Sequence, residues 1–411
     1  MGPIILFDKS FLQSLSIDES VWFDHFFYPN VCPIFYVETL ADLEKAVREG
    51  RTPEEEVGII ASKFPQMHGG PNAHHTELCS VNLGGMTVQM DGTIARNDGH
   101  YVKAEGKTGL VFEESATAMA FSRWQKGQFL DVERLFARAW RESLNSINLD
   151  IIAENFRAVG IDGKVCKSLK EAKEIAQKIV NSREKATYKM KLAFHFLNIP
   201  SGIQEMILKR WKGAGYPPLS DYAPYVAYIL TVEIFFQIAL AAHLISSERP
   251  SNRIDMAYLF YLPFSMLFVS SDRLHRNCAE LFLRGNQNFV WGPDLKADLK
   301  KLNEYYSSLP EEEKQRGVMS FAGDPPKEGD YLVAKLWDNH FPRWRERKEI
   351  NITRDGELEK KIVKEANKIA DARALQPGEI DFNIQKTSNM VVKRLISKKK
   401  GSWWLVSKDL T

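Results

Sequence analysis

Asp255 and Asp272 have the residue type and the setting to bind a cation. Asp255 opens a short predicted helix, and Asp272 follows an apolar run, Met266–Ser270, that predicts a strand. A carboxylate at a helix start and another at a strand end can converge on one point. Converging carboxylates bind hard divalent ions such as Mg²⁺, which prefers oxygen ligands. This segment therefore predicts half of a metal site.

The N-terminal region offers the other half. The apolar run Ile4–Phe7 predicts a strand that ends in Asp8, and a second predicted strand, Ile34–Val37, ends in Glu38. Active sites of open α/β sheets lie outside the carboxyl ends of the strands. We therefore expect one acidic group at that edge, where a divalent cation would neutralise charges that otherwise repel one another. The acidic group consists of Asp8, Glu38, Asp255 and Asp272.

The order of these elements resembles the PIN-domain nucleases. In that family a first strand ends in Asp-x-Ser/Thr/Asn, which matches Asp8-Lys9-Ser10. A Glu follows the second strand, as Glu38 does here. A helix-opening Asp then precedes a strand that ends in Ser/Thr-x-Asp, which matches Asp255 and Ser270-Ser271-Asp272. The chain departs from the family in one respect, because roughly 200 residues separate Glu38 from Asp255.

The resemblance covers about residues 1–50 and 222–292. It implies an α/β protein with a three-layer α/β/α arrangement around a central parallel sheet, and Mg²⁺- or Mn²⁺-dependent cleavage of RNA or, less often, of structured DNA. Such proteins often act as toxins or defence effectors, so a regulatory protein partner is also implied. The predicted regions are a discontinuous core at 1–50 and 222–300, an insertion at 51–221 with hairpins near 80–112 followed by helices, and a helical, charge-rich region with a basic tail at 301–411.

The chemistry that the resemblance implies is hydrolysis by metal-activated water. A metal held by Asp8, Asp272 and either Glu38 or Asp255 would lower the pKa of a water and orient it for in-line attack on phosphorus. Asp42, four residues after Glu38, is expected to be a solvated helix acid, with an auxiliary ligand as the alternative. The expected substrate contacts are Ser10, Ser270, Arg273, His275, Lys398, Lys399, Lys400, Trp403 and Trp404.

Composition limits the classes of protein to which the chain can belong. The net charge is only +2, so any nucleic-acid surface must be a local patch. The four cysteines form no C-x-x-C pair, which indicates a reducing compartment, the cytoplasm, and no structural zinc. The apolar segment Tyr222–Ile245 is long enough to span a bilayer. It contains Glu233, Gln237 and His243, so we expect a buried helix and no membrane contact.

Two alternatives to a nuclease remain. The first is a PIN-like protein that binds nucleic acid or a partner without catalysis, and the second is a membrane-associated protein anchored by residues 222–245. Local signals predict a helix at Leu40–Arg48 and another that starts at Thr52-Pro53. Strands in the insertion are expected at Met86–Met90, Thr93–Ala95, His100–Ala104 and Leu110–Phe112.

Overall fold

The computed structural model describes residues 2–45, 50–104, 106–158, 160, 162–182, 184, 186–347, 356–379 and 387–409. The strands are β1 Ile4–Phe7, β2 Tyr28–Val31, β3 Gly70–Pro71, β4 Gly99–Ala104, β5 Lys107–Phe112, β6 Leu267–Ser270, β7 Asn288–Trp291, β8 Thr387–Val392, β9 Lys399–Lys400 and β10 Trp403–Trp404. The α-helices up to the long apolar one are α1 Lys9–Ser14, α2 Ile17–Phe26, α3 Pro33–Leu40, α4 Pro53–Ser62, α5 His75–Leu83, α6 Ala116–Trp124, α7 Asp131–Ser146, α8 Leu149–Ala158, α9 Leu169–Asn181, α10 Ala186–Phe196, α11 Ser201–Gly213, α12 Leu219–Tyr222 and α13 Pro224–Ala241. The later ones are α14 Asn252–Tyr258, α15 Arg273–Phe282, α16 Gly292–Ser307, α17 Glu311–Gln315, α18 Val318–Phe321, α19 Leu332–His340 and α20 Gly356–Ala370, and the 3₁₀ helices are η1 Ala41–Glu44, η2 Leu259–Phe264, η3 Trp344–Glu346 and η4 Pro377–Glu379.

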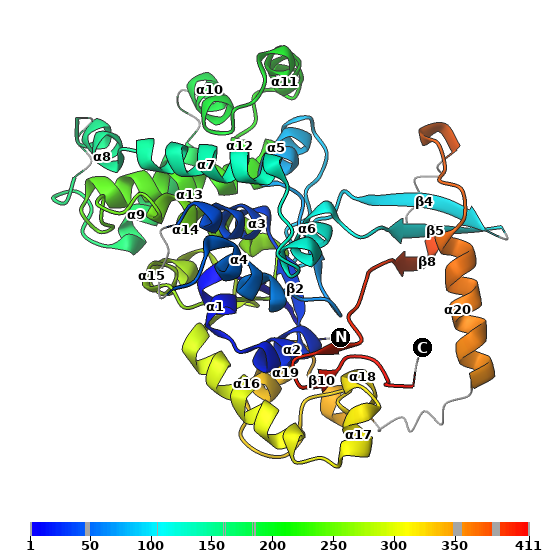
Figure 1. Ribbon diagram of the computed structural model, residues 1–411. Helices are drawn as coiled ribbons and strands as arrows, with labels where there is room; N and C mark the ends of the chain where they lie inside the picture. The colour runs from blue at the N-terminus through cyan, green and yellow to red at the C-terminus, as the bar shows by residue number, and fades with distance from the viewer. Residues whose placement is uncertain are drawn as a thin grey trace.

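A parallel sheet forms the centre of the molecule (Figure 1). Its five strands within the described residues lie in the order β3-β2-β1-β6-β7, and every pair is parallel. The prediction of an α/β protein with a central parallel sheet is confirmed. Strands β1 and β6 are almost completely buried, as expected of strands covered on both faces. Strand β3 lies inside the range predicted as an insertion, so the sheet extends into that range.

The second strand is not where it was predicted. Ile34–Val37 belongs to helix α3, and the strand is Tyr28–Val31, which pairs with β1. Four consecutive apolar residues fit a helix or a strand equally well, and Pro33 at the first helical position favours the helix. The polar strand residue Asn30 is accommodated because its side-chain amide donates to the carbonyl of Phe264 at 2.9 Å.

Of two local helix predictions on the first half of the chain, one is confirmed. Thr52 caps α4 in a capping box with Glu55, and Pro53 takes the first helical position. The predicted helix at Leu40–Arg48 is only the short 3₁₀ helix η1, and its last predicted residues, 46–48, lie outside the described residues.

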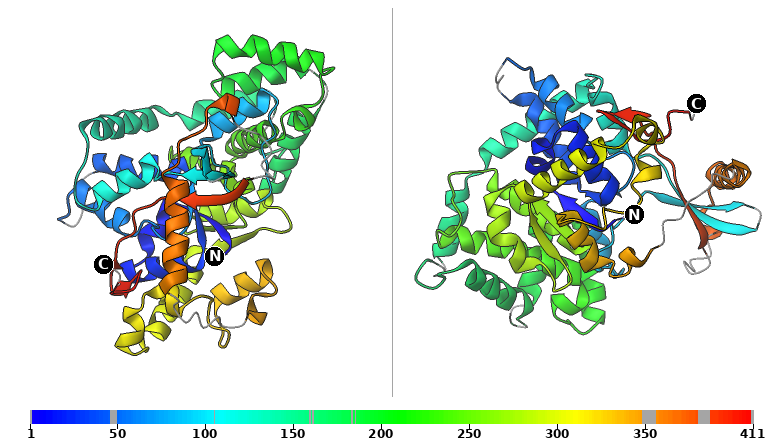
Figure 2. Two further views of the ribbon diagram at one scale, coloured as in Figure 1. Left: turned by 90° about the vertical axis from the view of Figure 1, so that its right-hand side faces the viewer. Right: turned by 90° about the horizontal axis from the view of Figure 1, so that it is seen from below.

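The insertion contains one hairpin, β4–β5, as predicted, and β8 from the C-terminal region pairs with β5 in parallel. Figures 1 and 2 show this three-stranded sheet with α20 as an arm beside the main body. The two other strands predicted there, Met86–Met90 and Thr93–Ala95, are wrong. Their backbone has other partners: Gly92 donates to Pro263, and the Asp91 carboxylate accepts from the backbone of Thr93.

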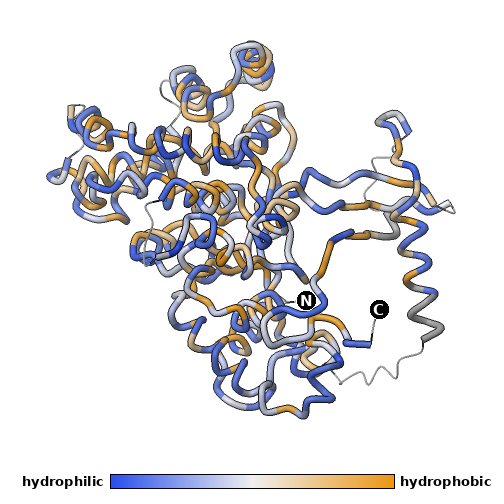
Figure 3. The backbone as a smooth tube through the Cα atoms, in the orientation of Figure 1, coloured by the Kyte–Doolittle hydropathy of each residue, from blue (hydrophilic) through white to orange (hydrophobic). Residues whose placement is uncertain are grey.

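One helix of the described residues, α13, is long and apolar enough to cross a membrane. It packs against α5, α8 and α9, and 83% of its most apolar stretch is buried inside the protein. Its one acid, Glu233, is paired with Arg253 at 2.5 Å. The helices α7 and α9 show the alternation of hydrophilic and hydrophobic residues expected of half-buried helices (Figure 3). The burial of α13 agrees with its prediction as a core helix.

The C-terminal segment returns to the main body. Trp403 is 2% exposed, lies edge-on to Trp22 and donates its indole N–H to Asn303 at 2.8 Å. The Lys400 ammonium is buried and donates to the backbone carbonyl of Phe64 at 3.0 Å. These contacts attach the end of the described chain to α2, to α16 and to the loop before β3.

Candidate acidic site at the carboxyl edge of the central sheet

The acidic site begins at the two central strands. From β1 the sheet continues through β2 and β3 to one side, and from β6 it continues to β7 on the other. The connections therefore diverge between β1 and β6, which is where open α/β sheets bind their ligands. Asp8 follows β1 directly and its backbone N–H donates to Val269 of β6 at 3.3 Å. Asp272 follows β6 after one intervening residue, so the sheet brings these two acids to the same edge.

Asp8 is a buried carboxylate with three hydrogen-bond donors. It caps helix α1 by accepting from the backbone N–H of Phe11 at 2.9 Å. Its second oxygen accepts from the hydroxyls of Ser10 at 2.6 Å and Ser270 at 2.7 Å. Burial alone would raise the pKa of Asp8, but the adjacent His275 and the two hydroxyls outweigh burial and lower it. Asp8 is therefore ionised, with about one of its four lone-pair positions left free.

His275 is completely buried between the strands and α14. Its Nδ1 lies 2.7 Å from the Ser270 hydroxyl oxygen, and its Nε2 lies 2.7 Å from the backbone carbonyl of Asp255. The Ser270 proton is donated to Asp8, so both ring nitrogens of His275 face acceptors and both must carry protons. Burial would lower the pKa of His275, but Asp8 and the Asp255 backbone raise it to about 9. The side chain is an imidazolium.

Asp272 is the N-cap of α15 and remains partly exposed. One of its oxygens accepts from the backbone N–H of Leu274 at 2.6 Å, and its own backbone N–H donates to the Ser270 hydroxyl at 2.9 Å. Its other oxygen has no protein partner among the described residues. Arg273 follows on the exposed surface of the helix. This end of the site is open to solvent.

Glu38 lies on helix α3, not after a strand, which corrects the predicted position. It accepts from the hydroxyl of Tyr258 at 2.7 Å, and its second oxygen lies 3.5 Å from the Lys9 ammonium. Lys9 is buried and also binds Asp42 at 2.9 and 3.0 Å. Burial would lower the pKa of Lys9, but Glu38 and Asp42 raise it, so Lys9 is charged.

Asp42 is not the solvated acid that the sequence predicts. Asp42 is 2% exposed. Besides Lys9, its carboxylate forms ion pairs with Lys45 at 2.6 Å and with Arg141 at 3.6 Å. Its two hydrogen bonds with Lys9 anchor that ammonium beside the acidic group. Lys9 is the contact that sequence reasoning missed, although its position next to Asp8 could have indicated it.

Asp255 lies in the first turn of α14, as predicted, and differs from the other acids. No donor contacts its carboxylate among the described residues. Burial raises its pKa to about 7. The His275 cation opposes this rise, and the charges of Glu38, Asp272 and Asp8 add to it. Asp255 therefore lies within electrostatic reach of Glu38, Asp272 and Asp8.

The donor chemistry of this site fits Mg²⁺ or Mn²⁺, because every available ligand atom is a carboxylate oxygen. The positions of these side chains in the structure, however, are not those of metal ligands. Among the described residues, no three His, Cys, Asp or Glu side chains stand in positions to hold a metal ion. The groups that could move to do so are the unpartnered carboxylate of Asp255, the free oxygen of Asp272 and the Glu38 oxygen near Lys9. Metal binding requires these side chains to rotate.

The predicted substrate contacts fall into two sets. Ser10 and Ser270 donate to Asp8, and Ser270 and His275 have no exposed surface, so these two buried side chains position the acidic group and do not face a substrate. The tail residues lie elsewhere, in contact with α2 and with the loop before β3. Lys400 and Trp403 are buried there, Lys398 and Lys399 are exposed, and Trp404 is half-buried with Lys398 and Lys399 over its ring.

Comparisons of the chain with protein-family models, with curated proteins and with solved structures found no match. The resemblance to PIN-domain nucleases stays a prediction that rests on the residue pattern.

Proposed function

We propose that this protein is a PIN-like, divalent-metal-dependent nuclease that acts on RNA. The observation that supports it best is the interaction of four carboxylates beside the switch point of an all-parallel sheet. A buried carboxylate whose pKa is raised at a ligand-binding position, as that of Asp255 is, is typical of a functional site. The four cysteines are buried free thiols, in keeping with the proposed reducing cytoplasm.

In this proposal each side chain has a distinct role. Asp255, Asp272 and Glu38 would hold Mg²⁺ or Mn²⁺, which when bound supplies the Lewis acidity that phosphodiester hydrolysis needs. Asp8 is oriented by Ser10 and Ser270 and completes the negative charge at the site. Arg273 is exposed beside Asp272 and is available to a phosphate of the substrate.

A second candidate function is a PIN-like protein that binds nucleic acid or a protein partner without cleaving RNA. Two observations favour it. The buried imidazolium of His275 lies 3.5 Å from Asp8, and Lys9 lies 3.5 Å from Glu38. These fixed cations neutralise part of the acidic group without a metal.

One assay separates the two functions. A 5′-labelled single-stranded RNA and a structured DNA are incubated with the full chain in Mg²⁺, in Mn²⁺ and in EDTA. The nuclease proposal predicts cleavage of RNA with either metal and none in EDTA. Absence of cleavage with both metals, together with RNA binding that EDTA leaves unchanged, would favour the non-catalytic function.

A further inference from the structure

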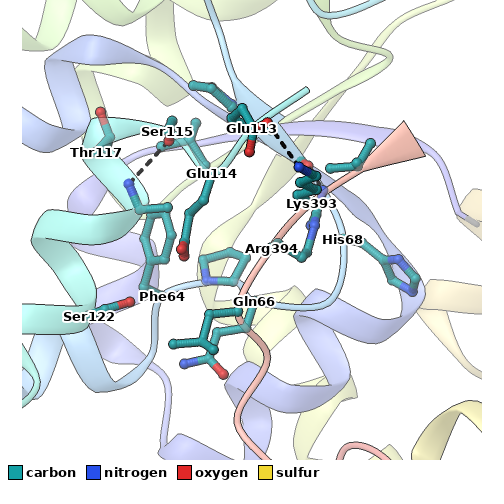
Figure 4. Close-up of a pocket in the computed structure, with 18 of the residues that line it drawn as sticks. Phe64, Gln66, His68, Glu113, Glu114, Ser115, Thr117, Ser122, Lys393 and Arg394 are labelled. Atoms are coloured by element: carbon teal, nitrogen blue, oxygen red, sulfur yellow. Dashed lines mark hydrogen bonds and ion pairs between the residues drawn. The ribbon is translucent and has the colours of Figure 1, made fainter. Parts of the chain in front are cut away.

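A cavity apart from the acidic group lies where three distant parts of the chain meet (Figure 4). One wall is the loop of residues 64–71, the second is the start of α6 with the residues before it, and the third is the tail segment Val392–Leu395. The cavity holds about 640 Å³ with its open mouth included.

Hydrogen bonds hold the tail wall in place. The Arg394 guanidinium donates to the carbonyl of Gly69 at 2.9 Å, and the backbone N–H of Ser397 donates to the side chain of Gln66 at 3.1 Å. Lys400 adds its bond to Phe64. Three successive contacts between the same two segments make this wall a built part of the cavity.

A carboxylate and a guanidinium that line the cavity are not paired with each other. Glu113 is paired with Lys393 at 3.3 Å, and Arg96 is paired with Asp98 at 2.7 Å. In contrast, the Glu114 carboxylate has no partner in the described part of the chain, and its side chain extends toward Phe64 and Gln66 (Figure 4). Arg394 has no carboxylate partner among those residues either. A ligand for this cavity should therefore offer N–H donors to a carboxylate and acceptors to a guanidinium.

The remaining lining favours a partly apolar ligand. Phe64, Pro65 and Pro71 line the cavity on the loop side, and Leu395 lines it on the tail side. Phe64 is held by stacking on Phe121 at 4.1 Å. Leu395 is 68% exposed, which leaves an apolar side chain at the cavity mouth that a bound ligand would cover.

We propose that this cavity binds an unpaired guanine base. Guanine carries adjacent N–H donors on its Watson–Crick edge, which the Glu114 carboxylate would accept, and acceptors O6 and N7, which suit the Arg394 guanidinium. Adenine places an acceptor nitrogen where guanine has an N–H, so it would face Glu114 unfavourably. The choice of a nucleobase as the ligand rests on the proposed action on RNA. The proposal adds a preference for guanine at a position of the RNA other than the one at the acidic group.

The test measures binding of 5′-GMP, 5′-IMP and 5′-AMP to the full chain by titration calorimetry. The expected order is GMP, then IMP, which lacks the exocyclic amine, then AMP. Glu114→Gln should weaken GMP binding at least tenfold, because it replaces an ionised acceptor with a group that also carries a donor. The variant should fold normally, since Glu114 has no partner to lose within the described ranges. Glu328→Gln, at an exposed position, is the matched control and should bind GMP like the wild type.

Three results would each overturn the inference: no GMP binding by the wild type at millimolar concentration, equal binding of GMP and AMP, or unchanged GMP binding by Glu114→Gln. Asp272→Asn, which alters only the acidic group, should bind GMP normally. Selective GMP binding by a chain that cleaves no RNA would therefore reject the proposed nuclease and keep the guanine site. RNA cleavage without selective GMP binding would keep the proposed nuclease and reject the guanine site.

Discussion

The Nδ1 atom of His275 lies 3.5 Å from a carboxylate oxygen of Asp8, and the hydroxyl of Ser270 hydrogen-bonds to both. Asp8 follows β1, Ser270 ends β6, and the other ring nitrogen of His275 binds the backbone of α14. One buried cation therefore joins the two central strands to the helix that carries Asp255. The acidic group depends on this link for its arrangement.

Replacing His275 with alanine should destabilise the fold. The substitution leaves the buried Asp8 carboxylate without its cation, and loss of one partner of a buried pair typically costs about 3–5 kcal/mol. Urea unfolding followed by circular dichroism measures this change in the free energy of unfolding. The double variant His275→Ala/Asp8→Asn should be less destabilised than the sum of the two single variants, because it removes both charges. Strict additivity would show that the two side chains are not coupled.

Asp272→Asn should abolish metal-dependent RNA cleavage while leaving the fold intact. Asparagine is as good an N-cap as aspartate, so α15 keeps its bond to Leu274, but the site loses one charged ligand. Since outer-shell changes at metal sites cost 10–100-fold, the loss of a direct ligand should reduce the rate by more than about 100-fold. Asp131→Asn, in the first turn of α7, is the matched control and should cleave normally. Full activity in Asp272→Asn would place the catalytic acids elsewhere.

The two tail tryptophans should differ in their contribution to stability. Trp403→Ala removes a buried side chain and its bond to Asn303, so it should cost about 3–5 kcal/mol. Trp404→Ala removes a half-buried ring that contacts surface lysines and should cost less than about 2 kcal/mol. Thermal and urea unfolding of the two variants makes the comparison. Equal losses would mean that the tail does not pack as described.

Stability should fall in mild acid because of His25. This side chain is buried, and burial lowers its pKa to about 4 despite its hydrogen bond with the Ala322 carbonyl. The unfolded chain, with a pKa near 6.5, binds more protons between these values. The contribution is therefore complete above about pH 6.5 and declines as the pH falls, by roughly 2 kcal/mol between pH 7 and pH 5. His25→Gln should reduce the decline of the unfolding free energy over that interval, and an unchanged decline would contradict the assignment.

The sequence by itself determined the elements whose signals are local. The apolar run before Asp8, the strand before Asp272, the capping box at Thr52 and the buried helix α13 each depend on residues within a few positions of one another. Three of the four acids could be assigned to their elements for the same reason. The carboxyl-edge rule for parallel sheets also placed Asp8 and Asp272 at one edge of the sheet.

Only the tertiary structure decided which contacts those elements make. The strand Tyr28–Val31 exists because β1 and Phe264 satisfy its polar groups, and Phe264 lies 234 positions from Asn30. The sequence predicts His275 and Trp403 as substrate contacts, but the two strands and α14 enclose His275, and Trp22 covers Trp403. Burial and charge pairing are set by neighbours that are remote in the chain, and a local pattern contains no information about them.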